Sequence, residues 1–146
     1  MNAVLTYPAL PSAEVVSILK PQCALHTDCS DVHSAFASQK DPGFVLLHTM
    51  GTEATFSKRH IPNAVFLPHR LITAERMQEW PMQTLFVTYC AGPHCNAAEQ
   101  AALRLAQLGR PVKLMLGGLM GWEFEGFAFA GHRADQADAI AENCGC

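Results

Sequence analysis

The chain has 146 residues, 49% of them hydrophobic and 16% charged, which is typical of one globular domain with a moderate core and excludes a disordered chain. Its formal net charge is −3, with 10 basic against 13 acidic residues, and it has no basic cluster of the kind that binds nucleic-acid phosphates. No apolar run approaches the roughly 18 residues of a membrane span, and the first residues do not resemble a signal peptide, so we expect a cytoplasmic protein without a nucleic-acid or membrane partner.

Helix and strand signals alternate along the first half of the chain. Ser12 is expected to be a helix N-cap, and the apolar spacing after it predicts a short helix. This helix is expected to end at the Lys20–Pro21 step, because proline keeps the preceding residue out of the helical region. The other elements expected here are strands at 23–27, 44–48 and 64–68, a helix from 28 or 30 to about 39, and one or two helical turns over 52–59.

The second half of the chain continues the same alternation. Thr73 caps a brief helix before Pro81, and Gly109 ends a longer helix that begins near Asn96. Strands are expected at 85–89 and 112–116, with a last short helix from 117. Strands that alternate with helices favour right-handed crossovers and a parallel sheet. The sequence therefore predicts a three-layer α/β fold, with a mostly parallel five-stranded sheet flanked by helices on both faces.

Three segments divide the chain. Residues 1–22 are expected to be an N-terminal extension with a short helix, and residues 23–130 the main domain. Residues 131–146 are a C-terminal extension with a helix near 134–142 and the ending Cys144-Gly145-Cys146.

Six cysteines are many for a chain of this length. Because no export signal is present and the core is adequate, we interpret them as buried, reactive or metal-binding thiols rather than as a disulfide framework. Cys23 falls in a predicted strand and Cys29 at a helix start, and both are interpreted as structural.

Cys90 follows the apolar strand 85–89 directly, and a tight loop then leads into a helix. In parallel sheets, reactive groups gather beyond the carboxyl ends of the strands. A thiolate at this place faces loop amides and the positive end of a helix dipole, and both favour the anion. Gly92 lets successive amides turn inward as an anion nest. The alternative is a small buried hydrophobic cysteine at the end of a strand.

Four segments in order resemble the rhodanese (sulfurtransferase) superfamily over roughly residues 23–130. They are FVLLH at 44–48, RHIPNAVFLP at 59–68, LFVTYC at 85–90 and LGGLMGW at 116–122. The resemblance implies a rhodanese-like fold, with Cys90 as the catalytic nucleophile and neither a cofactor nor a metal. Asn63 stands where the family usually has a glycine, in a left-handed turn, and Trp122 is expected to anchor the last helix in the core.

Loop length distinguishes sulfur chemistry from oxyanion chemistry. The sulfur-handling members of the superfamily have a six-residue loop, which here is Cys90, Ala91, Gly92, Pro93, His94 and Cys95. The related phosphatases and arsenate reductases have a seventh residue, an arginine that binds the oxyanion. The seventh residue here is Asn96, so the loop lacks the main cation of a phosphatase.

The mechanism implied by the resemblance is covalent ping-pong sulfur transfer. Cys90 takes the outer sulfur of a donor such as thiosulfate, polysulfide or a persulfide, the amides at 91–95 hold the persulfide anion, and a thiol, protein or other nucleophilic acceptor removes the sulfur. A monomer or a homodimer is compatible with the sequence.

Several positions depart from the family pattern. His48-Thr49-Met50 replaces the family's Asp-Val-Arg, and His94 is the loop's only basic residue, which argues against thiosulfate as the natural donor. Arg59 and Arg70 either reach the mouth of the site or are solvated surface charges. These departures leave open an alternative, a non-catalytic rhodanese-like module for binding or regulation.

The remaining thiols suggest redox functions. Cys95, five residues beyond Cys90, can act as a resolving thiol that closes a disulfide with it and gates sulfur transfer, unless the compact loop forbids the geometry. Cys144 and Cys146 can relay sulfur from Cys90, help to bind a soft metal, or have no function.

Overall fold

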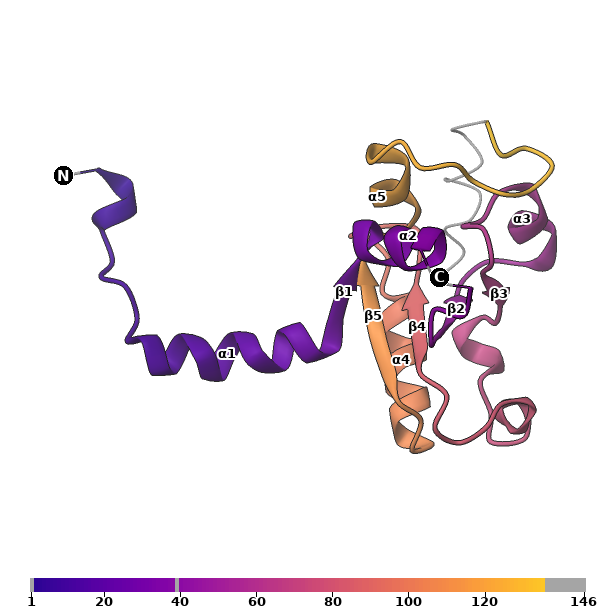
Figure 1. Cartoon of the computed structure of the whole chain (residues 1–146), viewed down its shortest axis with the longest axis horizontal. Helices are drawn as coiled ribbons and strands as arrows, with labels where there is room; N and C mark the ends of the chain where they lie inside the picture. Colours follow the sequence, from indigo (N-terminus) through magenta and orange to yellow (C-terminus); the bar gives the residue numbers. More distant parts are fainter. Residues whose placement is uncertain (1, 39, 136–146) are drawn as a thin grey trace.

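The computed structural model of the chain describes residues 2–38 and 40–135. Figure 1 shows a compact body with an N-terminal arm that projects away from it. The arm comprises η1 (Ala3–Leu5) and α1 (Ser12–Leu25). The strands of the body are β1 (His26–Asp28), β2 (Val45–His48), β3 (Val65–Phe66), β4 (Phe86–Tyr89) and β5 (Val112–Leu116). Its helices are α2 (Cys29–Ser38), α3 (Glu53–Lys58), η2 (His69–Leu71), η3 (Arg76–Glu79), α4 (Ala97–Gln107) and α5 (Gly118–Phe124).

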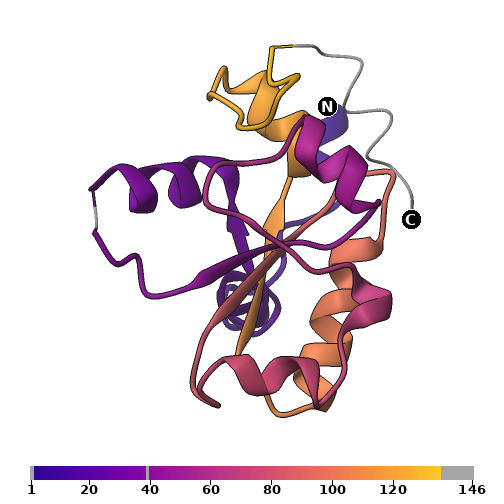
Figure 2. The same ribbon diagram turned by 90° about the vertical axis from the view of Figure 1, so that its right-hand side faces the viewer.

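The five strands form one parallel sheet in the order β1-β5-β4-β2-β3. Figure 2 shows α2 and α4 on opposite sides of this sheet. On the side of α4, the buried cluster includes Leu47, Phe86 and Leu105. On the side of α2 and α5, it includes Leu46 and Val87. Neighbouring residues of β2 and β4 thus enter opposite core layers, as the period of two in a strand requires, and the predicted three-layer α/β fold is confirmed.

Local signals in the sequence place most of the elements correctly. The Asp28 carboxylate accepts a hydrogen bond from the Asp31 amide at 2.8 Å and so caps α2, and the Thr73 hydroxyl accepts from the Arg76 amide at 3.1 Å before η3. Asn63 has φ of 70°, in the predicted left-handed region. Trp122 is buried and donates from Nε1 to the Ala128 carbonyl at 3.0 Å, so its predicted role as a core anchor is confirmed.

The predicted end of the first helix is wrong. α1 does not stop at Lys20 but continues through Pro21 to Leu25, and the strand expected at 23–27 is reduced to β1 at His26–Asp28. Proline fixes φ near the helical value and removes one amide donor, and the favourable helix formers after it carry the helix onward.

The helix expected near 134–142 falls almost wholly outside the described residues. Within the described part of the chain, none of the helices has the length and apolar character to cross a membrane.

Candidate active site around Cys90

Cys90 lies directly after β4, the middle strand of the sheet, at its carboxyl end. Its side chain is 6% exposed and lines a cavity of about 290 Å³. The cavity is lined by the Cys90 loop, the start of α4 and the end of β5: Cys90, Gly92, Pro93, Cys95, Ala98, Glu99, Leu114, Met115, Leu116, Gly117 and Gly118. The strand order therefore brings the predicted nucleophile to the wall of a small cavity, with little contact with bulk water.

The first turn of α5 holds the Cys90 loop from one side. The amide of Leu119 donates to the Cys90 carbonyl at 3.0 Å, and that of Met120 donates to the Ala91 carbonyl at 2.9 Å. This approach requires glycine at position 118, because a Cβ there would lie 2.2 Å from the Cys90 carbonyl oxygen. A Cβ at Gly92 would lie 2.6 Å from the sulfur of Met120 on the same helix, a contact that the methionine side chain can relieve by moving. The LGGLMGW segment therefore packs against the backbone of the Cys90 loop.

The Cys90 thiol contacts carbonyl oxygens of its own loop. Its Sγ donates to the carbonyl of Cys95 at 3.1 Å and lies 3.8 Å from that of Gly92. The prediction that amides 91–95 all face the sulfur needs correction in two places. Pro93 has no amide hydrogen, and the Cys95 amide donates to the Gly92 carbonyl at 3.1 Å. The candidate amides for an anionic sulfur are therefore those of Ala91, Gly92 and His94.

Cys95 is buried beside Cys90, but the two are not bonded to each other. Cys90 is a thiol, whereas Cys95 is disulfide-bonded. The interpretation of the cysteines as thiols is therefore wrong for Cys95. A resolving role of Cys95 toward Cys90 stays a prediction and needs this disulfide to be reduced first. The candidate relay thiols Cys144 and Cys146 lie outside the described residues.

A buried polar group replaces the Asp-Val-Arg of the family pattern. His48, Thr49 and Met50 are all fully buried. The Tyr89 hydroxyl accepts from the Ile61 amide at 3.3 Å and lies 2.6 Å from His48 Nδ1. The hydroxyl and Nδ1 share a hydrogen bond, and the tautomer of His48 decides which of the two atoms donates.

These contacts tie together the backbone beneath the Cys90 loop. His48 and Tyr89 face each other in the register of β2 and β4, and Thr49 Oγ1 donates to the Tyr89 carbonyl at 2.7 Å. Sequence reasoning did not identify Tyr89 as important. The available signal was a histidine and a tyrosine at the ends of two apolar strands, and pairing them required the sheet order.

The two arginines considered for the mouth of the site have other contacts. Arg59 is 4% exposed, lies 3.4 Å from a Glu123 carboxylate oxygen and stacks 3.9 Å above the centre of the Phe129 ring. It is therefore a buried structural cation rather than a surface charge. Arg70 is exposed and donates to the Gly51 carbonyl at 3.0 Å. The charged residue that lines the Cys90 cavity is instead an acid, Glu99.

The two remaining described cysteines differ sharply from each other. Cys29 is buried, and burial, with Asp28 and Glu125 nearby, raises the pKa of its thiol to about 11. Its Sγ contacts the Leu116 and Gly118 carbonyls at 3.5 and 3.6 Å, which confirms a structural role. Cys23 is exposed on α1, so the prediction of a strand position for it is wrong.

The fold and the loop define the class of this protein. It is a parallel α/β domain with a buried thiol directly after the middle strand of its sheet. The sequence profile of the rhodanese-like domain family matches residues 33–125, which is more than half of the chain. The chain therefore belongs to this family, as the four sequence segments indicated.

Solved structures show the same architecture. A protein of Bacillus halodurans is 26% identical, with a TM-score of 0.82 over 88% of this chain and 93% of its own. A rhodanese-like domain from Anabaena is 22% identical, with a TM-score of 0.65 over 77% of this chain and 83% of its own. A thiosulfate sulfurtransferase from Pseudomonas aeruginosa is 16% identical, with a TM-score of 0.62 over 85% of this chain and 25% of its own. Comparison with curated proteins gave no match.

Proposed function

We propose that the chain is a rhodanese-type sulfurtransferase or persulfide carrier with Cys90 as its nucleophile. The observation that supports this most directly is the placement of the Cys90 thiol at the carboxyl end of β4, on the wall of a cavity of about 290 Å³. Membership of the rhodanese-like family supports the same chemistry.

The proposed reaction has two balanced steps. The Cys90 thiolate attacks the outer sulfur of a donor RS–S⁻, a new Sγ–S bond forms, the donor S–S bond breaks, and RS⁻ leaves with the electron pair. An acceptor thiolate then attacks the outer sulfur of Cys90–S–S⁻, forms its own S–S bond, and returns Cys90 as a thiolate.

The loop has a different role for the thiol and for the anion. As a thiol, Cys90 donates to the Cys95 carbonyl. Deprotonation removes this hydrogen, so the sulfur anion and that carbonyl oxygen repel each other. We expect the anionic sulfur to turn toward the candidate amides of Ala91, Gly92 and His94, which suit a diffuse charge because each adds a separate donor.

Mass spectrometry after treatment with polysulfide tests the proposal. We expect the peptide that contains Cys90 to gain the mass of one sulfur atom, located on Cys90 by fragment ions. A Cys90→Ser variant should not gain it, and a thiol acceptor should remove it from the wild type. The exposed Cys23 thiol reports in the same sample whether the donor was active.

The opposing candidate is the non-catalytic rhodanese-like module, which the loss of the family's Asp and loop cations favours. It predicts that Cys23 takes up sulfur while Cys90 does not. That pattern in the wild-type protein would contradict the enzyme.

We propose further that the donor is a singly charged alkyl persulfide rather than thiosulfate. Glu99 lines the Cys90 cavity, and its negative charge repels the thiosulfate dianion more strongly than a donor with one negative charge. Glu99→Gln should raise the rate of Cys90 loading from thiosulfate, relative to an alkyl persulfide, by roughly fivefold, the equivalent of about 1 kcal/mol. Stopped-flow loading at low salt measures the ratio, since salt screens the effect.

Glu75→Gln is the matched control, because this exposed glutamate lies outside the cavity. An unchanged ratio in Glu99→Gln, or an equal change in both variants, would show that Glu99 does not select the donor. Gating by Cys95 and relay through Cys144 and Cys146 remain predictions that this donor preference does not require.

A further inference from the structure

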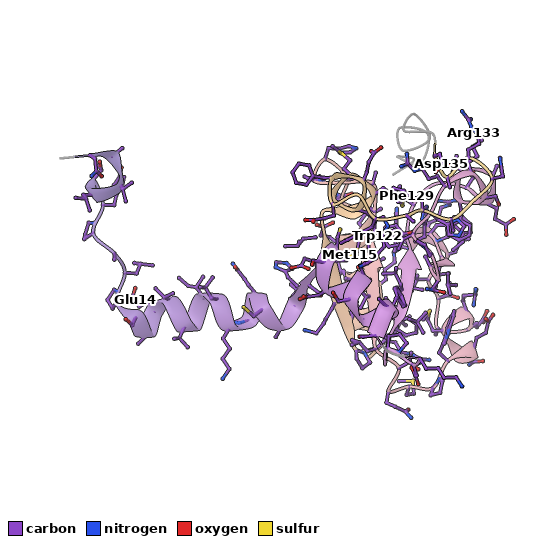
Figure 3. The ribbon with its side chains drawn as sticks, turned by 45° about the horizontal axis from the view of Figure 1, so that its top comes forward. Glu14, Met115, Trp122, Phe129, Arg133 and Asp135 are labelled. Atoms are coloured by element: carbon purple, nitrogen blue, oxygen red, sulfur yellow. The ribbon has the colours of Figure 1, made fainter. Side chains whose placement is uncertain are left out.

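The exposed apolar surface of this protein is concentrated on its N-terminal arm. Of 14 large hydrophobic side chains that are exposed, eight lie within residues 4–25. They are Val4, Leu5, Tyr7, Leu10, Val16, Ile18, Leu19 and Leu25. Figure 3 shows the side chains of α1 standing clear of the body, with Glu14 near its outer end. An apolar concentration of this kind marks an interaction site.

The body of the same chain cannot cover α1. The helix passes into β1 without a loop, and the His26 amide donates to the Gln22 carbonyl at the junction. Lys113 Nζ donates to the Ala24 carbonyl at 2.6 Å and fixes the junction to β5. α1 has no buried residue, and an isolated helix of 14 residues is marginal in water. Its stability therefore calls for a partner.

The spacing of the apolar residues on α1 indicates which partner. Val15, Ile18, Gln22 and Leu25 follow the 3-4-3 spacing of the a and d positions of a heptad, and Leu19 adjoins them. Such a seam packs against a second seam of the same kind. The opposite face of α1 carries Ala13, Ser17, Lys20 and Ala24, with Val16 at its edge.

Part of the chain before β1 is matched by a solved structure. The match to the Bacillus halodurans protein covers 88% of this chain with a TM-score of 0.82. The residues from β1 to the C-terminus make up less than 88% of the chain, so the match must include residues of α1 before β1.

We infer that α1 is a dimerisation helix that pairs antiparallel with α1 of a second copy of this chain. Antiparallel pairing of the seam places Val15 against Leu25 of the other copy, and Ile18 against its Gln22. Each of these contacts occurs twice in the dimer, once from each copy, as an isologous two-fold interface requires. This inference goes beyond the sulfur chemistry and does not depend on it.

The same pairing gives the segment before α1 a place to bind. α1 alone is about 21 Å long, which is short for the roughly 800 Å² that each partner buries in a stable interface. In the antiparallel pair, residues 4–10 run past β1 of the other copy. There a cavity of about 370 Å³ is lined by Leu19, Gln22, Cys23, His26, Thr27, Asp28, Asp31 and Leu116. Its apolar part, Leu19 and Leu116, suits one of the apolar side chains of residues 4–10.

A membrane surface is a poorer occupant. Amphipathic helices that bind membranes are rich in lysine and arginine on the polar face, and residues 1–25 contain one basic residue, Lys20.

Analytical ultracentrifugation of the full chain tests the inference. We expect the wild type to sediment at twice the mass of one chain, and a Val15→Glu/Ile18→Glu variant at the mass of one chain. Leu103→Glu should remain dimeric, because Leu103 is a comparably exposed leucine on α4 of the body. The tryptophan bands of the near-ultraviolet circular dichroism spectrum should be the same in all three, since Trp80 and Trp122 lie in the body and not on the arm.

Hydrogen exchange gives a second measurement that does not rely on the variant. The amides of α1 should be protected in the wild type at concentrations where it is dimeric, and should lose protection on dilution to the monomer. A monomeric wild type at every concentration, or a dimer that persists in Val15→Glu/Ile18→Glu, would overturn the inference.

Discussion

The Gly118→Ala variant is expected to lose about 2–5 kcal/mol of the free energy of unfolding. Gly118 has φ of +59°, and the left-handed conformation costs a residue with a side chain about 1–2 kcal/mol. The new Cβ would also lie 2.2 Å from the Cys90 carbonyl oxygen and 2.9 Å from the Ala91 carbonyl carbon. These are backbone atoms of a buried loop, and forcing them apart costs about 1–3 kcal/mol more.

The displacement should also reach the thiol. The Cys90 carbonyl that the new Cβ would push accepts the Leu119 amide at 3.0 Å. Moving it separates the Cys90 loop from α5, so we expect faster alkylation of Cys90 in Gly118→Ala. Urea denaturation and timed alkylation measure the two effects.

Gly126→Ala is the matched control for this experiment. Gly126 also has positive φ, at +77°, but a Cβ there meets nothing within 4 Å. It should therefore lose only the conformational part, about 1–2 kcal/mol, and leave Cys90 alkylation unchanged. Equal losses in the two variants would show that close contact with the Cys90 loop is not what position 118 requires.

The order of strands and helices could be predicted because each element has a local cause. Apolar runs of strand length gave β2, β4 and β5, and side-chain caps at Asp28 and Thr73 fixed where helices begin. Parallel pairing then follows from the alternation of strands with helices. The position of Cys90 beyond the end of a strand could be predicted from these local signals alone.

The arm could not be predicted in the same way. A proline after Lys20 normally argues for a helix end, yet α1 continues through Pro21. The residues of α1 make few contacts with the body, and the one hydrogen bond lost at Pro21 does not outweigh the helix formers that follow. The exposure of Cys23 is a direct consequence of this extra turn.

The environment of the Cys90 sulfur was predictable only in part. Pro93 shows in the sequence that one of the loop amides is missing. The bonds from the Cys90 thiol to the Cys95 carbonyl and from the Cys95 amide to Gly92 depend on the path of the loop backbone. A sequence pattern specifies that a loop turns tightly, but it does not specify which carbonyls turn inward.

The Tyr89→Phe variant is expected to lose about 2–4 kcal/mol of the free energy of unfolding. The Tyr89 hydroxyl is fully buried and serves both His48 Nδ1 and the Ile61 amide. Removing it takes a partner from two buried polar groups, and each such loss costs about 1–3 kcal/mol. The expected loss is smaller than twice the upper value for one group, because the hydrogen bond from the Ile61 amide, at 3.3 Å, is long. Thermal and urea unfolding measure the loss.

Ser34→Ala is the control, because Ser34 is exposed on α2 and the loss of its hydroxyl should change the free energy of unfolding by no more than about 0.5 kcal/mol. A loss in Tyr89→Phe no larger than that in Ser34→Ala would contradict the proposed role of the His48–Tyr89 pair.

The pH dependence of stability gives the Tyr89 pair a second signature. Burial raises the pKa of Tyr89 above its ordinary value of about 10. The unfolded chain therefore releases this proton at a lower pH than the folded protein does, so the contribution of Tyr89 is complete below pH 10 and declines as the pH rises above it. Above pH 10 the wild type should lose stability more steeply than Tyr89→Phe, and the difference between the two proteins should narrow. A difference that stays constant with pH would mean that burial does not keep the Tyr89 hydroxyl protonated in the folded protein.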